Sequence, residues 1–266
     1  QGVADLSHLD QLGPDRGTSV ALYKPAGADA DIRRFKLFRV QPLSLTDILP
    51  IFTHMGVEVV DEQPYEIHRA DGTSLHVYDF GLRVADAGTW EALSHERLRE
   101  LFEGAVLAVW DGHAESDGFN RLVLAAHLDW RQVVILRAIA KYLRQARTTF
   151  SQDYLEDALV ANPRIAADLV EVFETRFDPD RFTDDDAGRA ARAEAQEAAA
   201  DQVLEALDEV ASLDHDRIVR AFLAVILATL RTNVYQGRAT LSFKLEPAAI
   251  PDLPAPPPPL EIWVYS

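Results

Sequence analysis

Two short clusters have residue types and spacings from which metal or catalytic chemistry can be built, and each lacks a required member. His95-Glu96 begins like the helical zinc motif H-E-x-x-H, but Arg99 stands at the position of the second histidine. His113-Ala114-Glu115 resembles half of a zinc-deaminase signature, whose cysteine ligands cannot exist in a chain with no cysteine. The 8 histidines are scattered along the chain, so we expect no metal site.

Motifs for other chemistries are also missing from the sequence. It contains neither of the glycine-rich phosphate-binding motifs and no G-x-S-x-G nucleophile elbow. Carboxylates are abundant, but their spacing follows solvated helix faces and singles out no general acid–base pair. We therefore expect no catalytic residue and no cofactor-binding residue in these 266 residues.

The third cluster is a basic row, Arg137, Lys141 and Arg144, on a predicted helix over residues 130–143 that is apolar on nearly every other face. One interpretation is a face whose long side chains extend to solvent or form ion pairs with acidic helices. The other is a docking face for another domain or for an anionic effector. These three basic residues are our candidates for contacts with another domain or with an anion.

Composition excludes several classes of partner. The 43 acidic against 26 basic residues give a net charge of −17, which disfavours nucleic acid and anionic membrane surfaces as partners. The absence of cysteine excludes a disulfide framework and is compatible with a reducing compartment. No run reaches the roughly 18 apolar residues of a membrane span, and the first residues do not form a signal peptide. Because the chain lacks an initiator Met and stops after a strand-like run, we expect a piece of a longer protein.

The first part of the chain has the pattern of an α+β layer. Alternating apolar positions, an Asp71-Gly72 hairpin signal and two helical stripes give the order β-α-β-β-α, preceded by one extra strand. This is the order of a ferredoxin-like, or ACT-like, split βαβ layer. The predicted elements are the extra strand at 19–24, strands at 35–40 and 74–84 with strand-like stretches at 57–60 and 65–69 between them, and helices at about 44–55 and 90–110.

Residues from about 116 to 232 are predicted to be wholly helical, and strands follow beyond Gly237 with a proline-rich connector at 251–259 between them. The stretch 187–211 has apolar residues only in its second half, so its first half should face solvent or a missing partner. We predict three domains: an ACT-like domain at 1–113, a helical domain at 114–232, and strands with a proline-rich linker at 233–266 leading into an absent catalytic domain.

Several long segments have low-degeneracy sequences: FKLFRVQ at 35–41, LSLTDILPIFTHMGVEVVDEQPY at 43–65, AESDGFNRLVLAAHLDWRQVVILR at 114–137 with YLRQ at 142–145, RTNVYQ at 231–236, LSFKL at 241–245 and EIWVYS at 261–266. Together these segments resemble the large bacterial NAD-dependent glutamate dehydrogenases. The resemblance implies a cytoplasmic parent enzyme that oxidises L-glutamate to 2-oxoglutarate and ammonia with NAD. It also implies that the catalytic lysine segment and the Rossmann domain follow residue 266, so the fragment alone should be inactive and hold no cofactor.

The resemblance leaves two hypotheses for this fragment. It could be a non-catalytic scaffold that contacts the catalytic domain of the same chain and takes part in a homo-oligomer. Alternatively, it could be an ACT-type module that binds an amino-acid effector. The first turn of the layer, residues 40–44, lacks the glycine that usually makes room for such a ligand, which favours the scaffold. A standard ACT module also has a fourth strand after its second helix, and here residues 19–24 are predicted to replace it.

Overall fold

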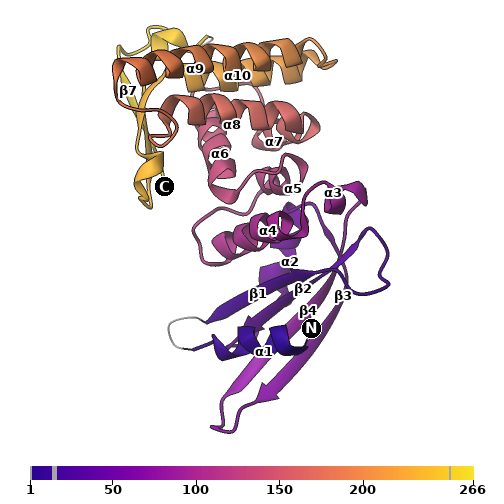
Figure 1. Ribbon diagram of the computed structural model, residues 1–266. Helices are drawn as coiled ribbons and strands as arrows, with labels where there is room; N and C mark the ends of the chain where they lie inside the picture. Colours follow the sequence, from indigo (N-terminus) through magenta and orange to yellow (C-terminus); the bar gives the residue numbers. More distant parts are fainter. Residues whose placement is uncertain (1, 14–16, 252) are drawn as a thin grey trace. The chain divides into compact units, whose positions relative to one another are not determined.

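The computed structural model describes residues 2–13, 17–251 and 253–266, and it divides into two compact units, residues 1–125 and 126–266. Unit 1 holds a four-stranded antiparallel sheet in the order β1-β2-β4-β3 (Figure 1). This confirms the α+β, ferredoxin-like layer. The elements are α1 (Gly2–Asp10), β1 (Thr18–Tyr23), β2 (Ile32–Arg39), α2 (Leu45–His54), β3 (Glu58–His68), β4 (Ser74–Arg83), α3 (Gly88–Glu91), α4 (His95–Trp110), the 3-10 turn η1 (Gly118–Arg121) and α5 (Leu122–Ala125).

Strand β1 takes the place of the fourth strand of a ferredoxin-like layer. It pairs antiparallel with β2 along its whole length, from Thr18 opposite Arg39 to Tyr23 opposite Arg34. Strands β2, β3 and β4 have the order and directions of the first three strands of that fold. The prediction that residues 19–24 replace the missing strand is therefore confirmed.

The two faces of the sheet are covered by different helices. Phe35 is fully buried and makes edge-to-face contacts with Phe52 of α2 and Phe102 of α4. On the other face, buried Phe38 packs with Leu9 at the end of α1. The alternation of side chains along β2 explains how one strand serves both layers.

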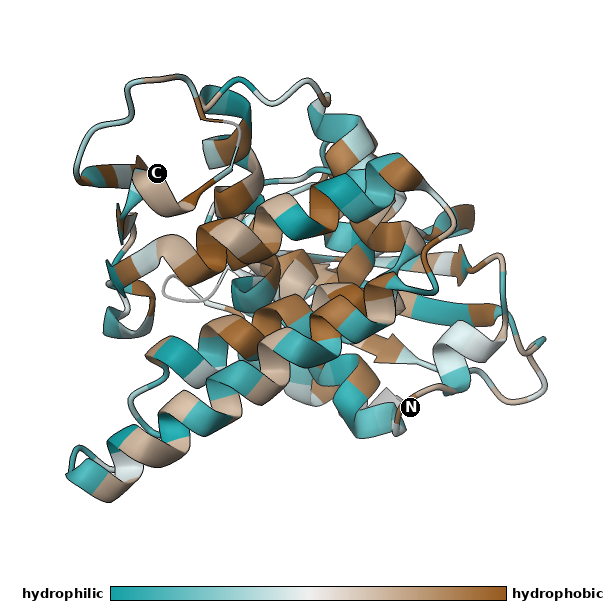
Figure 2. Ribbon diagram, turned by 90° about the horizontal axis from the view of Figure 1, so that it is seen from above, coloured by the Kyte–Doolittle hydropathy of each residue, from teal (hydrophilic) through white to brown (hydrophobic). Residues whose placement is uncertain are grey.

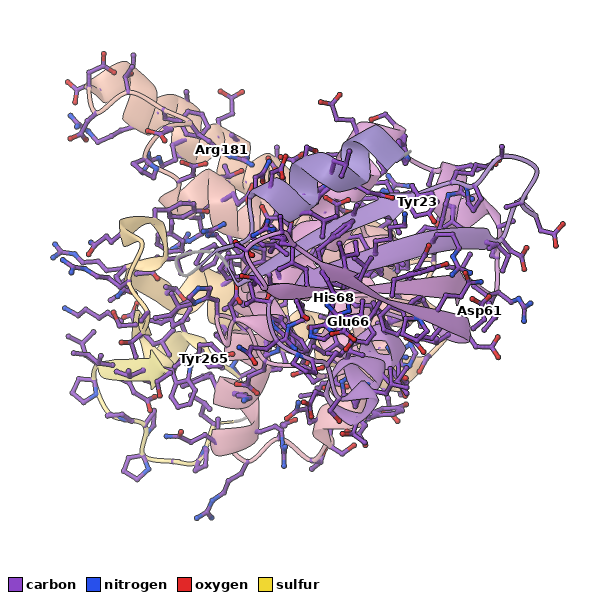
Figure 3. All side chains as sticks on the ribbon, turned by 90° about the horizontal axis from the view of Figure 1, so that it is seen from below. Tyr23, Asp61, Glu66, His68, Arg181 and Tyr265 are labelled. Carbon is purple, nitrogen blue, oxygen red and sulfur yellow. The ribbon has the colours of Figure 1, made fainter. Side chains whose placement is uncertain are left out.

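A polar cluster on β1–β4 joins all four strands. The buried Asp79 carboxylate of β4 accepts hydrogen bonds from the Tyr23 hydroxyl at 2.8 Å and from Arg34 Nε at 2.9 Å. Arg34 Nη1 donates in turn to Asp61 of β3 at 2.6 Å. Figure 3 labels Tyr23 and Asp61, which lie on the two edge strands. Burial, followed by Asp79, raises the pKa of Tyr23, so its hydroxyl stays a donor.

Three local expectations for unit 1 need correction. The segments 57–60 and 65–69 form one strand, β3, because Pro64 lies on an edge strand, where a missing N–H is tolerated. The helix predicted at 90–110 is interrupted between α3 and α4, and Ser94 caps the second of these by accepting from the N–H of Arg97. A serine at position 44, directly before α2, predicts a side-chain cap, but the Ser44 hydroxyl bonds the Thr46 hydroxyl and does not cap the helix.

Unit 2 is a helical block followed by a small antiparallel sheet in the order β5-β6-β7. The prediction that helix extends to Thr232 is wrong, because residues 229–232 form a strand. Its elements are α6 (Trp130–Gln145), α7 (Gln152–Ala161), α8 (Pro163–Phe177), α9 (Asp186–Leu207), α10 (Leu213–Ala228), β5 (Thr229–Thr232), the 3-10 turn η2 (Val234–Gln236), β6 (Leu241–Leu245), the 3-10 turn η3 (Pro247–Ala249) and β7 (Glu261–Tyr265).

The switch from α10 to β5 has a specific cause. Arg176 of α8 donates from Nη2 to the carbonyl oxygens of Leu227 at 3.2 Å and Thr229 at 2.8 Å. Carbonyls at a helix end lack intrahelical partners, so this guanidinium satisfies them and fixes the end of α10. Burial lowers the pKa of Arg176, because desolvation disfavours the charged form.

Helix α9 begins with mostly exposed residues, as predicted for the first half of 187–211. It is the long helix projecting at the lower left of Figure 2, where hydrophilic and weakly hydrophobic residues alternate. An exception is buried Gly188: a Cβ built there would lie 2.1 Å from the carbonyl oxygen of Thr183.

We expect Gly188→Ala to lower the free energy of unfolding by about 1–3 kcal/mol, because the added methyl group displaces the Thr183 backbone. Alanine normally stabilises a helix interior by roughly 1 kcal/mol relative to glycine, so the sign is opposite to the usual one. Urea unfolding followed by circular dichroism measures the change. Ala190→Gly, on the exposed face of α9, is the control that measures the effect of helix propensity alone on the free energy of unfolding. A Gly188→Ala variant that is more stable than the wild type would contradict the close contact.

Candidate functional site

Helix α6 is the central element of unit 2 and carries the predicted basic row. It packs against α7, α8 and α10, and an Asp129–Gln132 capping box fixes its start: Asp129 accepts from the N–H of Gln132 at 2.9 Å, and Gln132 Oε1 accepts from the N–H of Asp129 at 2.9 Å. Its apolar residues are buried on nearly every face, as the sequence pattern predicted.

The three basic residues lie at different depths. Arg137 is fully buried, Lys141 is half-buried and Arg144 is exposed. Arg144 Nη1 donates to Gln152 Oε1 of α7 at 3.3 Å, and Gln152 Nε2 donates to the buried Glu156 at 2.9 Å. The row therefore does not form one continuous outer face. Contacts with another domain or an anion remain a prediction for it.

The second half of α6 contacts strand β7. The sequence pattern alone did not indicate this contact. The Tyr142 hydroxyl donates to Glu261 Oε2 at 3.0 Å, and its ring lies 6.0 Å from that of Trp263 in an edge-to-face arrangement. Lys141 Nζ lies 5.5 Å from the ring centre of Tyr265, which Figure 3 labels on the C-terminal strand. Alternate residues of β7 thus face α6.

The other side chains of β7 are exposed. Ile262 and Val264 are 70% and 53% exposed, and among the described residues β7 has a strand neighbour only at β6. The alternation of residue types at 261–265 predicts from the sequence that the side chains of β7 divide into an inner and an outer set. It could not indicate which helix the inner residues would contact, because α6 is over a hundred residues away in the sequence.

Two further contacts join the helical block to the sheet. Phe173 of α8 packs edge-to-face on Phe243 of β6, with ring centres 6.2 Å apart, and Arg176 binds the carbonyls at the start of β5. Together with the Tyr142–Glu261 hydrogen bond, these contacts connect the helical block to all three strands of the sheet. Unit 2 is therefore a single packed body in which helices and sheet support each other.

In unit 1, two backbone groups of the turn at residues 40–44 form hydrogen bonds with side chains of the same unit. The N–H of Leu43 donates to the Tyr78 hydroxyl at 2.9 Å, and Arg39 Nη1 donates to the carbonyl of Pro42 at 3.2 Å. The Arg39 guanidinium also lies 4.7 Å from the ring centre of Trp110. The Leu43 N–H and the Pro42 carbonyl are thus bound from within the unit.

Polar side chains around the 3-10 turn η1 form local hydrogen bonds with the backbone, and Asp117 caps this turn. Asp117 accepts from the N–H of Phe119 at 3.1 Å, and Asn120 and Arg121 donate to the carbonyls of Glu115 and Gly118. Within residues 2–13, 17–251 and 253–266, no group of three or more His, Cys, Asp or Glu side chains could hold a metal ion. No helix in this part of the chain is long and apolar enough to cross a membrane.

We expect Tyr142→Phe to lower the free energy of unfolding by about 1 kcal/mol, since the Glu261 carboxylate loses its donor. Burial, and then Glu261, raise the pKa of Tyr142 above its usual value. A raised folded-state pKa stabilises the fold below the ordinary tyrosine pKa of about 10, and this contribution is lost as the pH rises further. Urea titrations at pH 7 and above pH 10 should show the two proteins converging at high pH.

Tyr154→Phe is the matched control for this prediction, because its hydroxyl has no hydrogen-bond partner in the described part of the chain. An equal loss in both variants would show that the Tyr142–Glu261 bond contributes nothing specific.

Comparison with known proteins identifies three segments. A family model described as the glutamate dehydrogenase ACT3 domain matches residues 17–96, so its match includes β1. The model of glutamate dehydrogenase helical motif 3 matches residues 114–179, and that of the bacterial NAD-glutamate dehydrogenase catalytic domain matches residues 202–266. The last match begins within α9, upstream of the boundary we predicted at 233. The three-domain division remains a prediction.

Individual relatives agree with these matches. The chain is 39% identical to the NAD-specific glutamate dehydrogenase of Pseudomonas aeruginosa and 38% identical to that of Halomonas elongata, over 99% of this chain in both cases. It is 42% identical to the Mycobacterium tuberculosis protein of the same name over 84% of this chain. The chain spans 14–16% of the length of these relatives. It therefore belongs to the family of large bacterial NAD-specific glutamate dehydrogenases.

Proposed function

We propose that this chain is a non-catalytic scaffold segment of an enzyme that oxidises L-glutamate to 2-oxoglutarate and ammonia with NAD. The observation that carries the proposal is the packing within unit 2. Residues matching the helical motif contact residues matching the catalytic domain through Tyr142–Glu261, Phe173–Phe243 and Arg176–Thr229. The helical motif is thereby a support on which that part of the catalytic domain is built.

The proposal assigns no catalytic residue, metal ligand or cofactor site to these residues. NAD and the reacting groups would be bound elsewhere in the parent enzyme, which we expect to be a cytoplasmic homo-oligomer. The alternative, an amino-acid-binding ACT module, is less favoured because the Leu43 N–H and the Pro42 carbonyl in the turn at residues 40–44 are bound by Tyr78 and Arg39. A ligand there would have to displace those hydrogen bonds.

Isothermal titration calorimetry of the 266-residue chain with NAD tests the first part of the proposal. We expect no binding heat, because the scaffold contributes no dinucleotide site. Circular dichroism confirms that the sample is folded. A dissociation constant in the micromolar range would overturn the assignment.

In the full-length enzyme, we expect the Trp263→Ala variant to lose its activity faster than the wild type at elevated temperature. The half-life of the activity, measured as glutamate-dependent reduction of NAD, should be several-fold shorter. The substitution removes the ring that packs on Tyr142 and costs about 3 kcal/mol or less, since Trp263 is only partly buried. The KM for NAD should stay within about two-fold, because a supporting residue does not touch the cofactor.

Leu213→Ala provides the control for this experiment, since Leu213 is 65% exposed at the start of α10. It should change neither quantity. A higher KM for NAD with unchanged heat stability in Trp263→Ala would place Trp263 in the substrate site and contradict the scaffold role.

A further inference from the structure

A cavity of about 560 Å³ lies in unit 2 where the end of α6, the start of α10 and the segment around Ile250 meet. Among the described residues, its lining includes three arginines, Arg147, Arg217 and Arg220, and no carboxylate. In a chain of net charge −17 this is unusual, and the cavity between α8 and α9, by comparison, includes Glu205 and Glu209 in its lining. The cavity thus concentrates positive potential in an acidic protein.

Arg147 has an unfavourable backbone conformation. Its φ is +66°, in the left-handed region that side chains rarely adopt. It follows α6 in a Schellman-type turn, in which the N–H of Thr148 donates to the carbonyl of Leu143 at 3.0 Å. Glycine is the preferred residue at that position. Within the described ranges, no carboxylate or carbonyl pairs with the Arg147 guanidinium, so no local contact offsets the backbone cost.

The two arginines of α10 are positioned by acidic neighbours on the same helix. Asp216 holds Arg220 through Nε at 3.0 Å and Nη2 at 2.9 Å, and Asp214 lies 3.7 Å from Arg217 Nη1. A guanidinium has five N–H donors, so the Nη1 group of Arg220 is left to donate to a ligand. These pairs also reduce the net charge near the cavity, so Arg147 is the main unneutralised cation.

The rest of the lining is mostly apolar, with two hydroxyls. Leu143, Phe150, Ile250 and Leu253 contribute apolar side chains, and Thr148 and Thr149 add hydrogen-bonding groups near Arg147. Guanidinium groups bind carboxylates through paired hydrogen bonds. Inorganic phosphate would leave the apolar residues uncovered, whereas a carboxylate with a branched or aromatic body would use both parts of the lining.

We propose that this cavity binds a small organic carboxylate with an apolar body, with Arg147 as the principal charge partner. The site goes beyond the scaffold function, and all of its lining residues belong to unit 2 and none to the ACT-like module.

The test is calorimetric titration of the 266-residue chain with phenylacetate and with isovalerate. We expect dissociation constants of about 1 mM or tighter, values typical of ligands of this size. Phenylacetamide, which lacks the charge, and inorganic phosphate, which lacks the apolar body, should each bind at least about ten-fold more weakly. Equal binding of phenylacetamide, tight binding of phosphate alone, or no binding of either carboxylate would overturn the proposal.

Arg147→Gly separates binding from folding. Glycine suits the left-handed conformation, so we expect the variant to melt about 2–4 °C higher than the wild type. It should bind phenylacetate at least about ten-fold more weakly, because the charge partner is gone. Arg131→Gln, an exposed arginine outside the cavity, is the matched control and should change neither value. Undiminished phenylacetate binding by a folded Arg147→Gly protein would refute the assigned role.

Discussion

The antiparallel pairing of β1 with β2 is the constraint on which the organisation of unit 1 depends. A ferredoxin-like layer needs a fourth strand beside its first, and here the chain provides that strand before the layer begins. Residues after α4 are consequently not required to return to the sheet. They continue into η1 and α5 and then into the helical block.

The register of this early strand is fixed by polar as well as apolar contacts. Tyr23 on β1 and Arg34 on β2 both bind the buried carboxylate of Asp79 on β4. A slip of one residue would turn these groups to the opposite face and leave Asp79 buried without partners, which is costly. The cluster therefore selects one register from several that β pairing alone would permit.

Unit 2 is organised by contacts between residues that lie far apart in the sequence. Arg176 ends α10 where β5 begins, and Tyr142 binds β7. The effect is that a sheet of only three strands gains a supporting layer of helices, which small sheets need for stability. This support also leaves α6 buried on most faces, which explains its almost continuous apolar sequence.

The elements with strong local patterns could be predicted from the sequence. The alternation around Asp71-Gly72 gave β4 and its hairpin. Glycine is the residue type preferred just after a helix, and Gly56, with a φ of +79°, directly follows the predicted helix at about 44–55. The end of α10 was missed because Arg176, which fixes it, is some fifty residues upstream.

The candidate sites were harder to predict than the elements. Arg137, Lys141 and Arg144 share one helix face in the sequence pattern, but their depth depends on the neighbouring helices. The cavity arginines come from two separate helix ends, and a left-handed φ at Arg147 leaves no signal when the residue is not glycine.

The exposed side of β7 has a consequence for the behaviour of the chain in solution. An edge strand with Ile262 and Val264 outward offers unpaired backbone groups next to apolar surface, the combination that promotes strand-to-strand association between copies. The net charge of −17 opposes that association by mutual repulsion, which dissolved salt screens over about 10 Å at 0.1 M. Ionic strength thus becomes the variable that governs whether copies of the isolated chain remain apart or aggregate.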